Sequence, residues 1–315
     1  MTRAPGSRSP VRWARLGPLS RLIARARPPR RPAVLVFSLP RSGSSWVGEV
    51  LGTADDAVYL REPITQGLHA AGLRVEDSVD VDPLALPAPH RRIAAAAFAA
   101  LPAFAGSIVP RPGTWGLGAR GARRLVVKEI NPLLLEHVLG RHRPRLVTLL
   151  RHPAAVALSY ARLGWSSDAQ SARLARYLAD VGLGRWTRPL ETATGFWARQ
   201  GAFQGAAQRV MLDRLLDRAP SRAVRYEDLC AAPVEEFRAL FAFAGLAWSE
   251  TTAAAIETHS AGGDEADTYG TRRDSRAMID RWRARVRPED LAALRSTYAA
   301  FELPWYSSED DWRAG

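Results

Sequence analysis

The sequence predicts an α/β domain in which a central parallel sheet of about five strands is flanked by helices. Segments rich in apolar and β-branched residues alternate with segments of helical periodicity, which is typical of parallel sheets with right-handed crossovers. Each apolar segment ends in charged or polar residues, and 315 residues suit one such domain better than two. The expected strands lie within residues 34–39, 57–63, 123–130, 145–153 and 221–229.

The chain is strongly basic, with a formal net charge of +12. Its 44 basic residues include a single lysine, Lys128, so a general bias toward arginine explains most of the excess. The charge favours nucleic acid, an anionic membrane or a small polyanionic ligand and does not choose among them. The single cysteine, Cys230, excludes an intrachain disulfide framework and a cysteine-rich zinc site, and the six histidines are scattered. We therefore expect no metal, and a protein that is made for a reducing compartment or is at least indifferent to redox.

Residues 1–32 form a basic leader with nine arginines, no acidic residue and no apolar core of a signal sequence. We expect this leader to be disordered, and neither a secretory signal nor a membrane span. Part of it can alternatively form an amphipathic helix on an anionic lipid surface. The main domain is expected at residues 33–306, followed by a short polar tail at 307–315. The expected location is cytoplasmic, with the inner face of the membrane as the alternative.

The first strand leads into the loop Pro-Arg-Ser-Gly-Ser-Ser-Trp, and a helical pattern follows this loop at once. Gly43 lets the backbone approach an anion, while the N–H groups and dipole of the helix point toward it. Ser44 and Ser45 add hydroxyl donors, and Arg41 adds a fixed positive charge. The segment therefore predicts a phosphate-binding loop.

This loop differs from the nucleotide-triphosphate loop, which needs the pattern G-x-x-x-x-G-K-S/T with its lysine on the terminal phosphates. The segment here has one glycine and no lysine. These differences weaken the case for a kinase-like phosphotransferase, which remains an alternative function. A catalytically inactive nucleotide-fold protein that binds polyanions or membrane is the other alternative.

Chemically useful residues also follow the other four strands. They are Glu62, Lys128, Arg151 and Tyr226, which join Arg41. Because ligands of parallel sheets bind beyond the carboxyl ends of the strands, we expect these side chains to meet at one edge of the sheet.

The fourth strand exit has the most specific pattern. Arg151 ends the strand, Pro153 suits a first helical turn, and Ser159 lies two turns into the helix. Arg151 and Ser159 can then reach one phosphate.

The segment between the second and third strands is long and rich in Pro, Gly and Ala. Residues 64–122 are unlike a simple crossover, and insertions at the active face commonly select substrates. We expect this segment to form an acceptor-side wall or lid.

Taken together, these motifs resemble the sulfotransferase family that uses 3′-phosphoadenosine-5′-phosphosulfate (PAPS). PRSGSSW is similar to the 5′-phosphosulfate loop in its bacterial and Golgi-carbohydrate style, LLRHPAAVALSY to the 3′-phosphate motif, and VRYEDLCAAP to a segment that lies near the adenine. The resemblance spans about residues 33–306. It implies a P-loop-like three-layer fold and transfer of a sulfuryl group to an acceptor hydroxyl, with release of adenosine 3′,5′-bisphosphate.

The resemblance also implies a donor site. Its residues would be Arg41, Ser42, Gly43, Ser44, Ser45, Trp46, Arg151, Ser159 and Tyr226, closed by a late basic loop that we place at Thr271, Arg272 and Arg273. In the family a tryptophan at the position of Trp46 stacks on the purine, and a core tryptophan is the alternative.

Sulfuryl transfer needs positioning, cations at the bridging oxygen and one base. Arg41 and Lys128 are the expected cations, and a lone lysine among arginines suggests that a compact point charge is needed there. Cytosolic members follow this lysine with Thr-His and use the histidine as the base, whereas Glu129 and Ile130 follow it here. By similarity to the carbohydrate branch we expect Glu62 to be the base, with Glu129 as its rival.

The acceptor can be a carbohydrate, a glycolipid or another small molecule, and the sequence leaves this choice open. No specific nucleic acid is expected as a partner, and the basic leader can contact an anionic membrane peripherally. The oligomeric state is not predicted.

Overall fold

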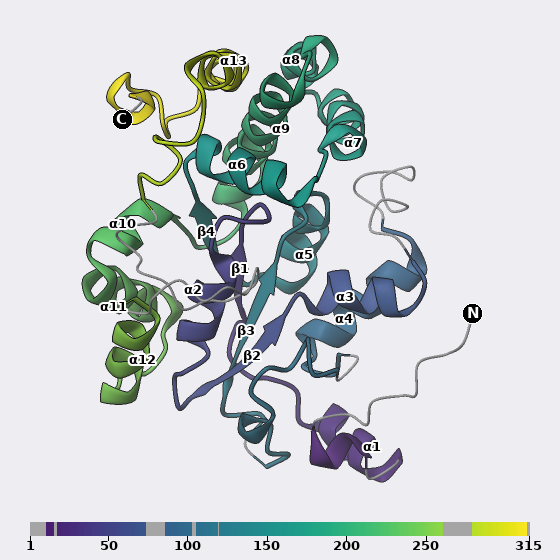
Figure 1. Ribbon diagram of the computed structural model, residues 1–315. Coiled ribbons are helices and arrows are strands. Elements are labelled where there is room, and N and C mark those ends of the chain that lie inside the picture. The colour runs from purple at the N-terminus through teal and green to yellow at the C-terminus, as the bar shows by residue number, and fades with distance from the viewer. Residues whose placement is uncertain are drawn as a thin grey trace.

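The computed structural model describes residues 11–15, 18–73, 86–102, 105–118, 120–260 and 279–313. Within them, five strands form one parallel sheet in the order β2-β3-β1-β4-β5 (Figure 1). The strands are β1 (Val34–Phe37), β2 (Ala57–Arg61), β3 (Arg124–Glu129), β4 (Arg145–Leu150) and β5 (Ser221–Arg225). The predicted fold class is confirmed, and every strand lies inside its predicted range.

Helices connect the strands and cover both faces of the sheet (Figure 1). They are α1 (Pro18–Ala26), α2 (Ser44–Leu51), α3 (Pro63–Ala70), α4 (Ala88–Phe98), α5 (Leu135–His142), α6 (Pro153–Leu163), α7 (Asp168–Asp180), α8 (Arg188–Thr192), α9 (Phe196–Val210), α10 (Tyr226–Ala231), α11 (Pro233–Ala244), α12 (Glu250–Ser260) and α13 (Pro288–Ala299).

The strands are buried on both faces because their side chains alternate between two apolar clusters. In β1, Val34 and Val36 face a cluster that includes side chains of α2, α10, α11 and α12. Leu35 and Phe37 face the other cluster, which includes side chains of α3 to α7, α9 and α13. This arrangement gives three layers, helices on sheet on helices.

The sheet has a topological switch point between β1 and β4, which are neighbours. The chain leaves β1 into α2, which packs on one face, and leaves β4 into α6, which packs on the other. The two connections therefore leave the sheet toward opposite faces. In doubly wound sheets, ligands bind at such a point, in a crevice beyond the carboxyl ends of the two strands. The predicted phosphate loop and Arg151 both lie at this edge.

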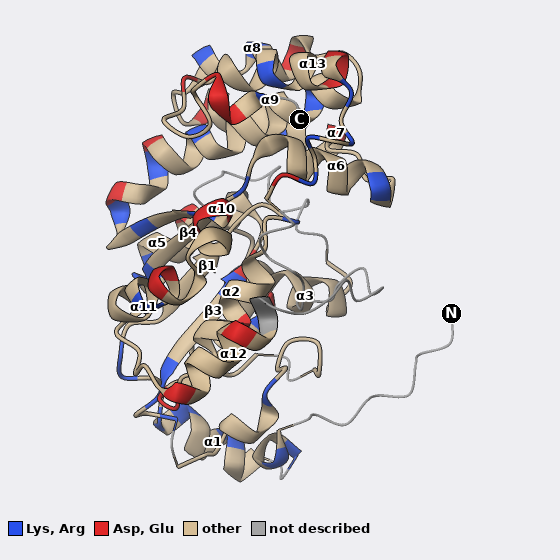
Figure 2. Cartoon of the chain, turned by 60° about the vertical axis from the view of Figure 1, so that its left-hand side comes forward, with Lys and Arg blue, Asp and Glu red and all other residues tan. Residues whose placement is uncertain are grey.

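The described part of the leader differs from the expected disorder. Val11 and Trp13 are buried, and Trp13 Nε1 donates a 2.6 Å hydrogen bond to the carbonyl of Trp115. The guanidinium of Arg120 lies 5.3 Å from the centre of the Trp13 ring and donates to the carbonyl of Ala24 in α1. An apolar ring and a buried cation thus hold this segment against the domain, while basic residues of α1 stay on the surface (Figure 2).

The polar end of the chain is attached to the domain through two residues, Trp312 and Asp311. Trp312 is 5% exposed, and its Nε1 donates to the carbonyl of Tyr306 at 2.7 Å. Arg225, the last residue of β5, forms an ion pair with Asp311. Asp311 and Trp312 therefore anchor this segment to the domain, whereas residues 307–310 are exposed.

The described part of the 64–122 segment supplies two α-helices, α3 and α4, which pack against each other and against β3. Among the described residues, no helix combines the length and apolar character needed to cross a bilayer.

Candidate active site

The loop after β1 turns sharply into α2, and Gly43 makes the turn possible. Gly43 has a φ of 95°, and a Cβ atom at this position would lie 2.6 Å from a ring carbon of Tyr226. A side chain would therefore meet both backbone strain and a rigid ring. Ser38 and Ser44 pin the two ends of the loop, since their hydroxyls lie 2.7 Å apart. The first N–H groups of a helix lack intrahelical partners, so the start of α2 is a natural anion site.

The two predicted phosphate motifs meet directly in the structure. Arg41 Nε donates to Ser159 Oγ at 2.9 Å, and Arg151 donates to the carbonyl of Arg41 at 3.0 Å. Arg41 itself has a φ of 71°, an unusual conformation for a residue with a side chain. Two guanidinium groups and a hydroxyl from separate elements therefore converge beside the loop, as anion binding requires.

Aromatic rings form the other wall of this region. The guanidinium of Arg151 lies 4.3 Å from the centre of the Tyr226 ring. Trp46 packs edge-on against Tyr226 and Phe237 and is 6% exposed, which leaves it little surface for stacking on a purine. The placement of Trp46 matches the core alternative. Ser42 is buried, whereas Ser45 and Gly43 are partly exposed.

This region also contains buried donors without hydrogen-bond partners among the described residues. They are Nε of Arg151 and Nε1 of Trp46. A buried N–H group that no protein atom satisfies is costly, and a bound anion could satisfy it. The donor set therefore fits a nucleotide that carries several phosphate or sulfate groups.

Glu62 and Lys128 meet at the ends of β2 and β3. The N–H of Glu62 donates to the carbonyl of Lys128 at 2.7 Å, and the two side chains form an ion pair. The Lys128 side chain is 4% exposed, whereas that of Glu62 is 21% exposed. Glu62 precedes Pro63, the first residue of α3, and has a φ of 50°. The pair places one ammonium and one carboxylate at the carboxyl edge of the sheet.

Glu129 lies on the opposite face of β3, because adjacent strand residues point to opposite sides. Its carboxylate accepts hydrogen bonds from Ile64 N at 2.6 Å and from Thr65 Oγ1 at 2.7 Å. Burial raises the pKa of the Glu129 carboxyl to about 7, although these hydrogen bonds act in the other direction. Glu129 thus fastens the start of α3 to β3 and so helps to fix the position of Glu62.

His152, which the sequence analysis did not identify, directly follows Arg151. It connects the last segment of the chain to the end of β4. Its ring stacks on Trp282, 4.2 Å between centres, and also contacts Trp312. Its backbone N–H donates to Glu227, whose carboxylate accepts from Tyr306 Oη as well. Burial lowers the pKa of His152 to about 3, so the ring is neutral. The only signal in the sequence for this cluster is Glu227, which directly follows Tyr226.

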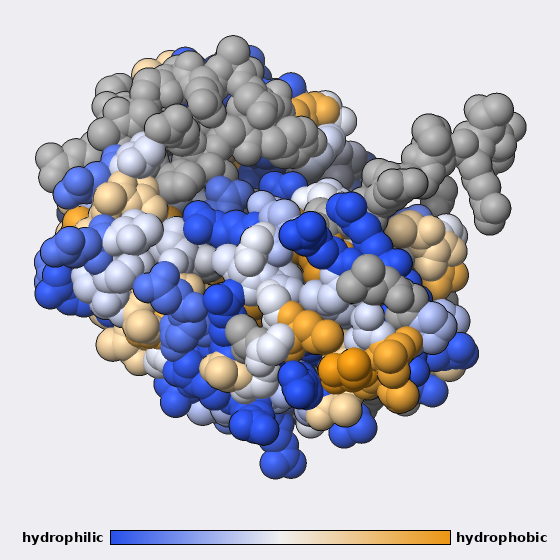
Figure 3. All heavy atoms as spheres, turned by 90° about the horizontal axis from the view of Figure 1, so that it is seen from below, coloured by the Kyte–Doolittle hydropathy of each residue, from blue (hydrophilic) through white to orange (hydrophobic). Residues whose placement is uncertain are grey.

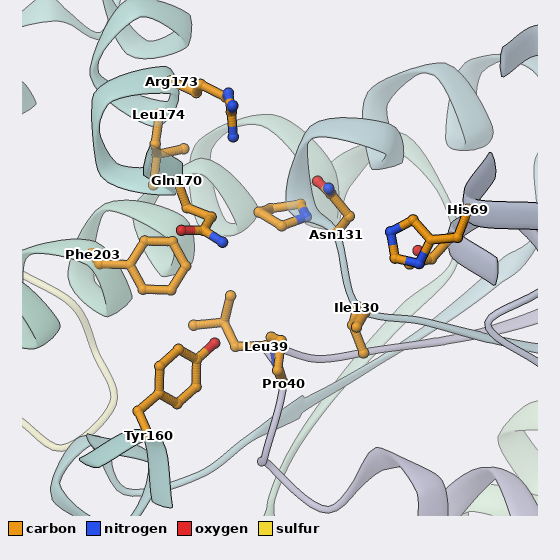
Figure 4. Close-up of a pocket in the computed structure, with 12 residues that line it drawn as sticks. Leu39, Pro40, His69, Ile130, Asn131, Tyr160, Gln170, Arg173, Leu174 and Phe203 are labelled. Carbon is orange, nitrogen blue, oxygen red and sulfur yellow. The ribbon is translucent and has the colours of Figure 1, made fainter. Parts of the chain in front are cut away.

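A cavity of about 190 Å³ adjoins this region (Figure 4). We call it the loop-side pocket, because Leu39 and Pro40 of the phosphate loop form part of its wall. Asn131 follows β3 and Tyr160 follows Ser159 in α6, so the pocket shares segments with the site above. Phe203 of α9 completes the wall in Figure 4.

Three predicted donor residues, Thr271, Arg272 and Arg273, lie outside the described residues. In the part of the chain that the structure describes, no group of three or more His, Cys, Asp or Glu side chains is placed to hold a metal ion.

Comparison with known proteins identifies a family match. Residues 32–250 match the profile of a family described as "Sulfotransferase family". A comparison with curated protein sequences yields no significant match.

Several solved structures resemble the chain at low sequence identity. The sulfotransferase domain from the curacin biosynthetic pathway is 17% identical, with a TM-score of 0.48, covering 86% of this chain and 98% of that one. The sulfotransferase domain from the olefin synthase of Synechococcus PCC 7002 is 18% identical, with a TM-score of 0.47 and coverages of 86% and 96%. Mouse sulfotransferase SULT7A1 complexed with PAP is 12% identical, with a TM-score of 0.45 and coverages of 91% and 89%.

Proposed function

This chain belongs to the sulfotransferase family, and we propose that its Glu62–Lys128 pair transfers a sulfuryl group from PAPS to an acceptor hydroxyl. The transferase activity and the use of PAPS follow from the family. The roles of individual residues and the nature of the acceptor are the content of the proposal.

The observation that carries the residue roles is the ion pair between Glu62 and Lys128, since Lys128 lies beside β1, the strand that leads into the phosphate loop. In-line transfer breaks the bond between sulfur and the bisphosphate oxygen and forms a bond between sulfur and the acceptor oxygen. Negative charge develops on the leaving oxygen, and a nearby cation stabilises it. Lys128 and Arg41 are the proposed sources of that positive charge.

The acceptor hydroxyl must lose its proton as the new bond forms, and Glu62 is the proposed base. Its carboxylate is the more exposed member of the pair, so an acceptor can approach it. Glu129 is less suited to this role because both of its oxygens already accept hydrogen bonds from the start of α3. In this proposal, the role of Glu129 is to hold the start of α3 in position.

The donor nucleotide would bind along the loop from Arg41 to Ser45 and at Arg151, Ser159 and Tyr226. Support comes from the convergence of Arg41, Arg151 and Ser159 and from the buried, unsatisfied Nε of Arg151. The late basic residues Thr271, Arg272 and Arg273 remain proposed donor contacts. We also propose that α3, through Thr65 and His69, forms the acceptor-side wall.

We further propose peripheral contact between α1 and an anionic membrane at its inner face. Leu19 and Leu22 are 69% and 62% exposed, and the exposed Arg21 and Arg25 lie on the same helix. Seen from below, the side on which α1 lies in Figure 1, the surface carries an apolar patch among hydrophilic residues (Figure 3). Apolar residues beside basic ones suit the boundary of an anionic bilayer.

The direct test of the function is transfer of a labelled sulfuryl group from PAPS to a panel of carbohydrates, glycolipids and small hydroxyl compounds. A parallel reaction with labelled ATP and magnesium tests the phosphotransferase alternative. Sulfuryl transfer that needs no magnesium supports the proposal. Phosphoryl transfer in its place would support the kinase-like alternative, and binding of PAPS without any transfer would support the inactive one.

A further inference from the structure

The carboxylate of Glu227 connects three parts of the chain. Its Oε1 accepts a hydrogen bond from the backbone N–H of His152 at 2.9 Å, just after β4. Its Oε2 accepts one from the hydroxyl of Tyr306 at 2.7 Å, near the end of the chain. Glu227 itself lies in the first turn of α10, which directly follows β5. A single side chain therefore fixes the ends of two strands and the last segment of the chain relative to one another.

Two of these anchor points lie next to residues that we assign to the donor nucleotide. His152 directly follows Arg151, and Glu227 directly follows Tyr226. The guanidinium of Arg151 also lies 4.3 Å from the centre of the Tyr226 ring. A displacement of the Glu227 carboxylate would therefore move the backbone beside both residues. The inference below rests on the proposed function, because that function assigns Arg151 and Tyr226 to the donor.

Arg151 depends on its surroundings for its orientation. Among the described residues, its guanidinium donates to the carbonyl of Arg41 at 3.0 Å and packs on the ring of Tyr226. Its Nε is buried and has no hydrogen-bond partner in the part of the chain that the structure describes. The position of the guanidinium therefore follows from the backbone at residues 151–152 and from the Tyr226 ring. Glu227 is hydrogen-bonded to the first of these and adjacent in the chain to the second.

Tyr306 is fixed in a conformation that its own backbone disfavours. Its φ is 53°, which is unusual for a residue with a bulky side chain, and it is 2% exposed. The guanidinium of Arg225 lies 4.6 Å from the centre of its ring. Burial, together with the charge of Glu227, raises the pKa of the Tyr306 hydroxyl far above its ordinary value, so the hydroxyl stays protonated and donates. A strained residue persists only where its contacts hold it, and such residues are frequent at functional sites.

We propose that Tyr306 is a positioning residue for the donor nucleotide. Its hydroxyl holds the carboxylate of Glu227, which in turn keeps Arg151 and Tyr226 in the arrangement that recognises the 3′-phosphate. Tyr306 lies outside residues 32–250, the part of the chain that matches the family profile. The last segment of the chain thereby contributes to recognition of the donor without contacting it.

Tyr306→Phe removes the hydroxyl and keeps the ring. The measured quantity is the ratio of the Kd of adenosine 5′-monophosphate to that of adenosine 3′,5′-bisphosphate, obtained by isothermal titration calorimetry. The monophosphate lacks the 3′-phosphate, so this ratio reports on the contacts of Arg151. The ratio is expected to fall by about fivefold or more, because a hydrogen bond to a charged group typically contributes at least that much.

Tyr298→Phe is the matched control. Tyr298 is also 2% exposed, and its hydroxyl donates to the side-chain oxygen of Gln208 at 2.6 Å. Both variants lose one buried hydroxyl from the same end of the chain, so both are expected to lower the Tm by a few degrees. Only Tyr306→Phe should lower the ratio. An unchanged ratio in Tyr306→Phe, or an equal fall in Tyr298→Phe, would overturn the inference.

A double-mutant cycle with Glu227→Gln tests whether Tyr306 acts through Glu227. Tyr306→Phe should then change the ratio about fivefold in the unmodified protein and less than about twofold in the Glu227→Gln background. Equal changes in the two backgrounds would overturn the inference. No preference for the bisphosphate in the unmodified protein would overturn the assignment of Arg151, and this inference with it. Transfer of a labelled sulfuryl group from PAPS tests the proposed function separately, so an active protein whose ratio survives Tyr306→Phe would contradict this inference alone.

Discussion

Lys128 and Glu62 are held together twice, by an ion pair between their side chains and by a hydrogen bond from Glu62 N to the carbonyl of Lys128. The backbone bond extends the pairing of β2 with β3, in which Arg61 lies opposite Lys128. The next residue, Glu62, leaves the sheet with a φ of 50° and directly precedes α3. The cation and the proposed base are thus fixed by the sheet itself, before any substrate binds.

Adenosine 3′,5′-bisphosphate is expected to raise the Tm more than adenosine 5′-monophosphate, because the 3′-phosphate can bind Arg151 and Ser159. A ligand that binds only the folded state at about 100 times its Kd stabilises it by about 2.7 kcal/mol, or several degrees in Tm. Thermal unfolding with each nucleotide measures this.

The matched variants for this test are Arg151→Gln, which should remove the difference between the nucleotides, and Arg162→Gln, which should keep it. Arg162 is an exposed residue of α6, the helix that follows Arg151. Equal Tm shifts by both nucleotides in the unmodified protein would remove the 3′-phosphate assignment.

Gly43→Ala is expected to weaken binding of the donor nucleotide and to lower the free energy of unfolding by about 1–3 kcal/mol, the usual cost of a strained backbone. The added methyl group would also meet the Tyr226 ring. Nucleotide titration and urea unfolding measure the two effects.

Gly182→Ala provides the control for strain alone. Gly182 also has a positive φ, of 78°, but a Cβ there would meet no atom within 4 Å. It should destabilise the protein without changing nucleotide affinity. An unchanged affinity in Gly43→Ala would mean that the loop does not hold the donor.

Glu129→Gln is expected to flatten the dependence of stability on pH. Burial raises the pKa of Glu129 from 4.5 to about 7, so the folded state holds this proton more tightly than the unfolded state. The resulting stabilisation is complete below the unfolded pKa and is lost as the pH rises through the folded one. At about 1.4 kcal/mol per pKa unit, its size is on the order of 3 kcal/mol.

Urea unfolding between about pH 5 and 8 measures this loss. The glutamine variant should lose less stability than the unmodified protein over that interval, while Glu257→Gln, at an exposed position of α12, should follow the unmodified protein. Parallel curves for the unmodified protein and Glu129→Gln would contradict the assignment.

Replacing Leu19 and Leu22 with serine is expected to reduce binding to anionic vesicles while leaving the Tm nearly unchanged, since both side chains are exposed. Trp13→Ala should instead lower the free energy of unfolding, by about 3–5 kcal/mol, because Trp13 is buried. Vesicle co-sedimentation and thermal unfolding provide the two measurements. Undiminished sedimentation of the double serine variant would exclude α1 as the membrane contact.

The strands were predictable because each is a short apolar run, and apolar runs separated by helical patterns allow few alternatives. The residues at the ends of the strands were predictable for the same reason. Arg41, Lys128 and Arg151 lie at or just after the carboxyl ends of their strands, on the same side of the sheet. The alternation of side chains along a strand also predicted that Lys128 and Glu129 face opposite sides of the sheet.

Other features depend on contacts between residues far apart in the sequence. The leader looked disordered because its composition is basic, yet Trp13 finds Trp115 and Arg120 as partners. Residues 307–311 and 313 are polar, and the one apolar ring among them, Trp312, holds the tail in place through His152. Trp46 belongs to a motif, and its burial depends on Phe237, which no local pattern reveals.

The central claim is that Glu62 accepts the proton of the acceptor hydroxyl, and single-turnover transfer of a labelled sulfuryl group by Glu62→Gln tests it most directly. The amide keeps the shape of the side chain but cannot take the proton. The rate is expected to fall by about 10²- to 10⁴-fold, with the affinity for adenosine 3′,5′-bisphosphate unchanged and Glu129→Gln retaining most of its activity. Near-normal transfer by Glu62→Gln together with loss of transfer in Glu129→Gln would contradict the account and move the base to the other face of β3.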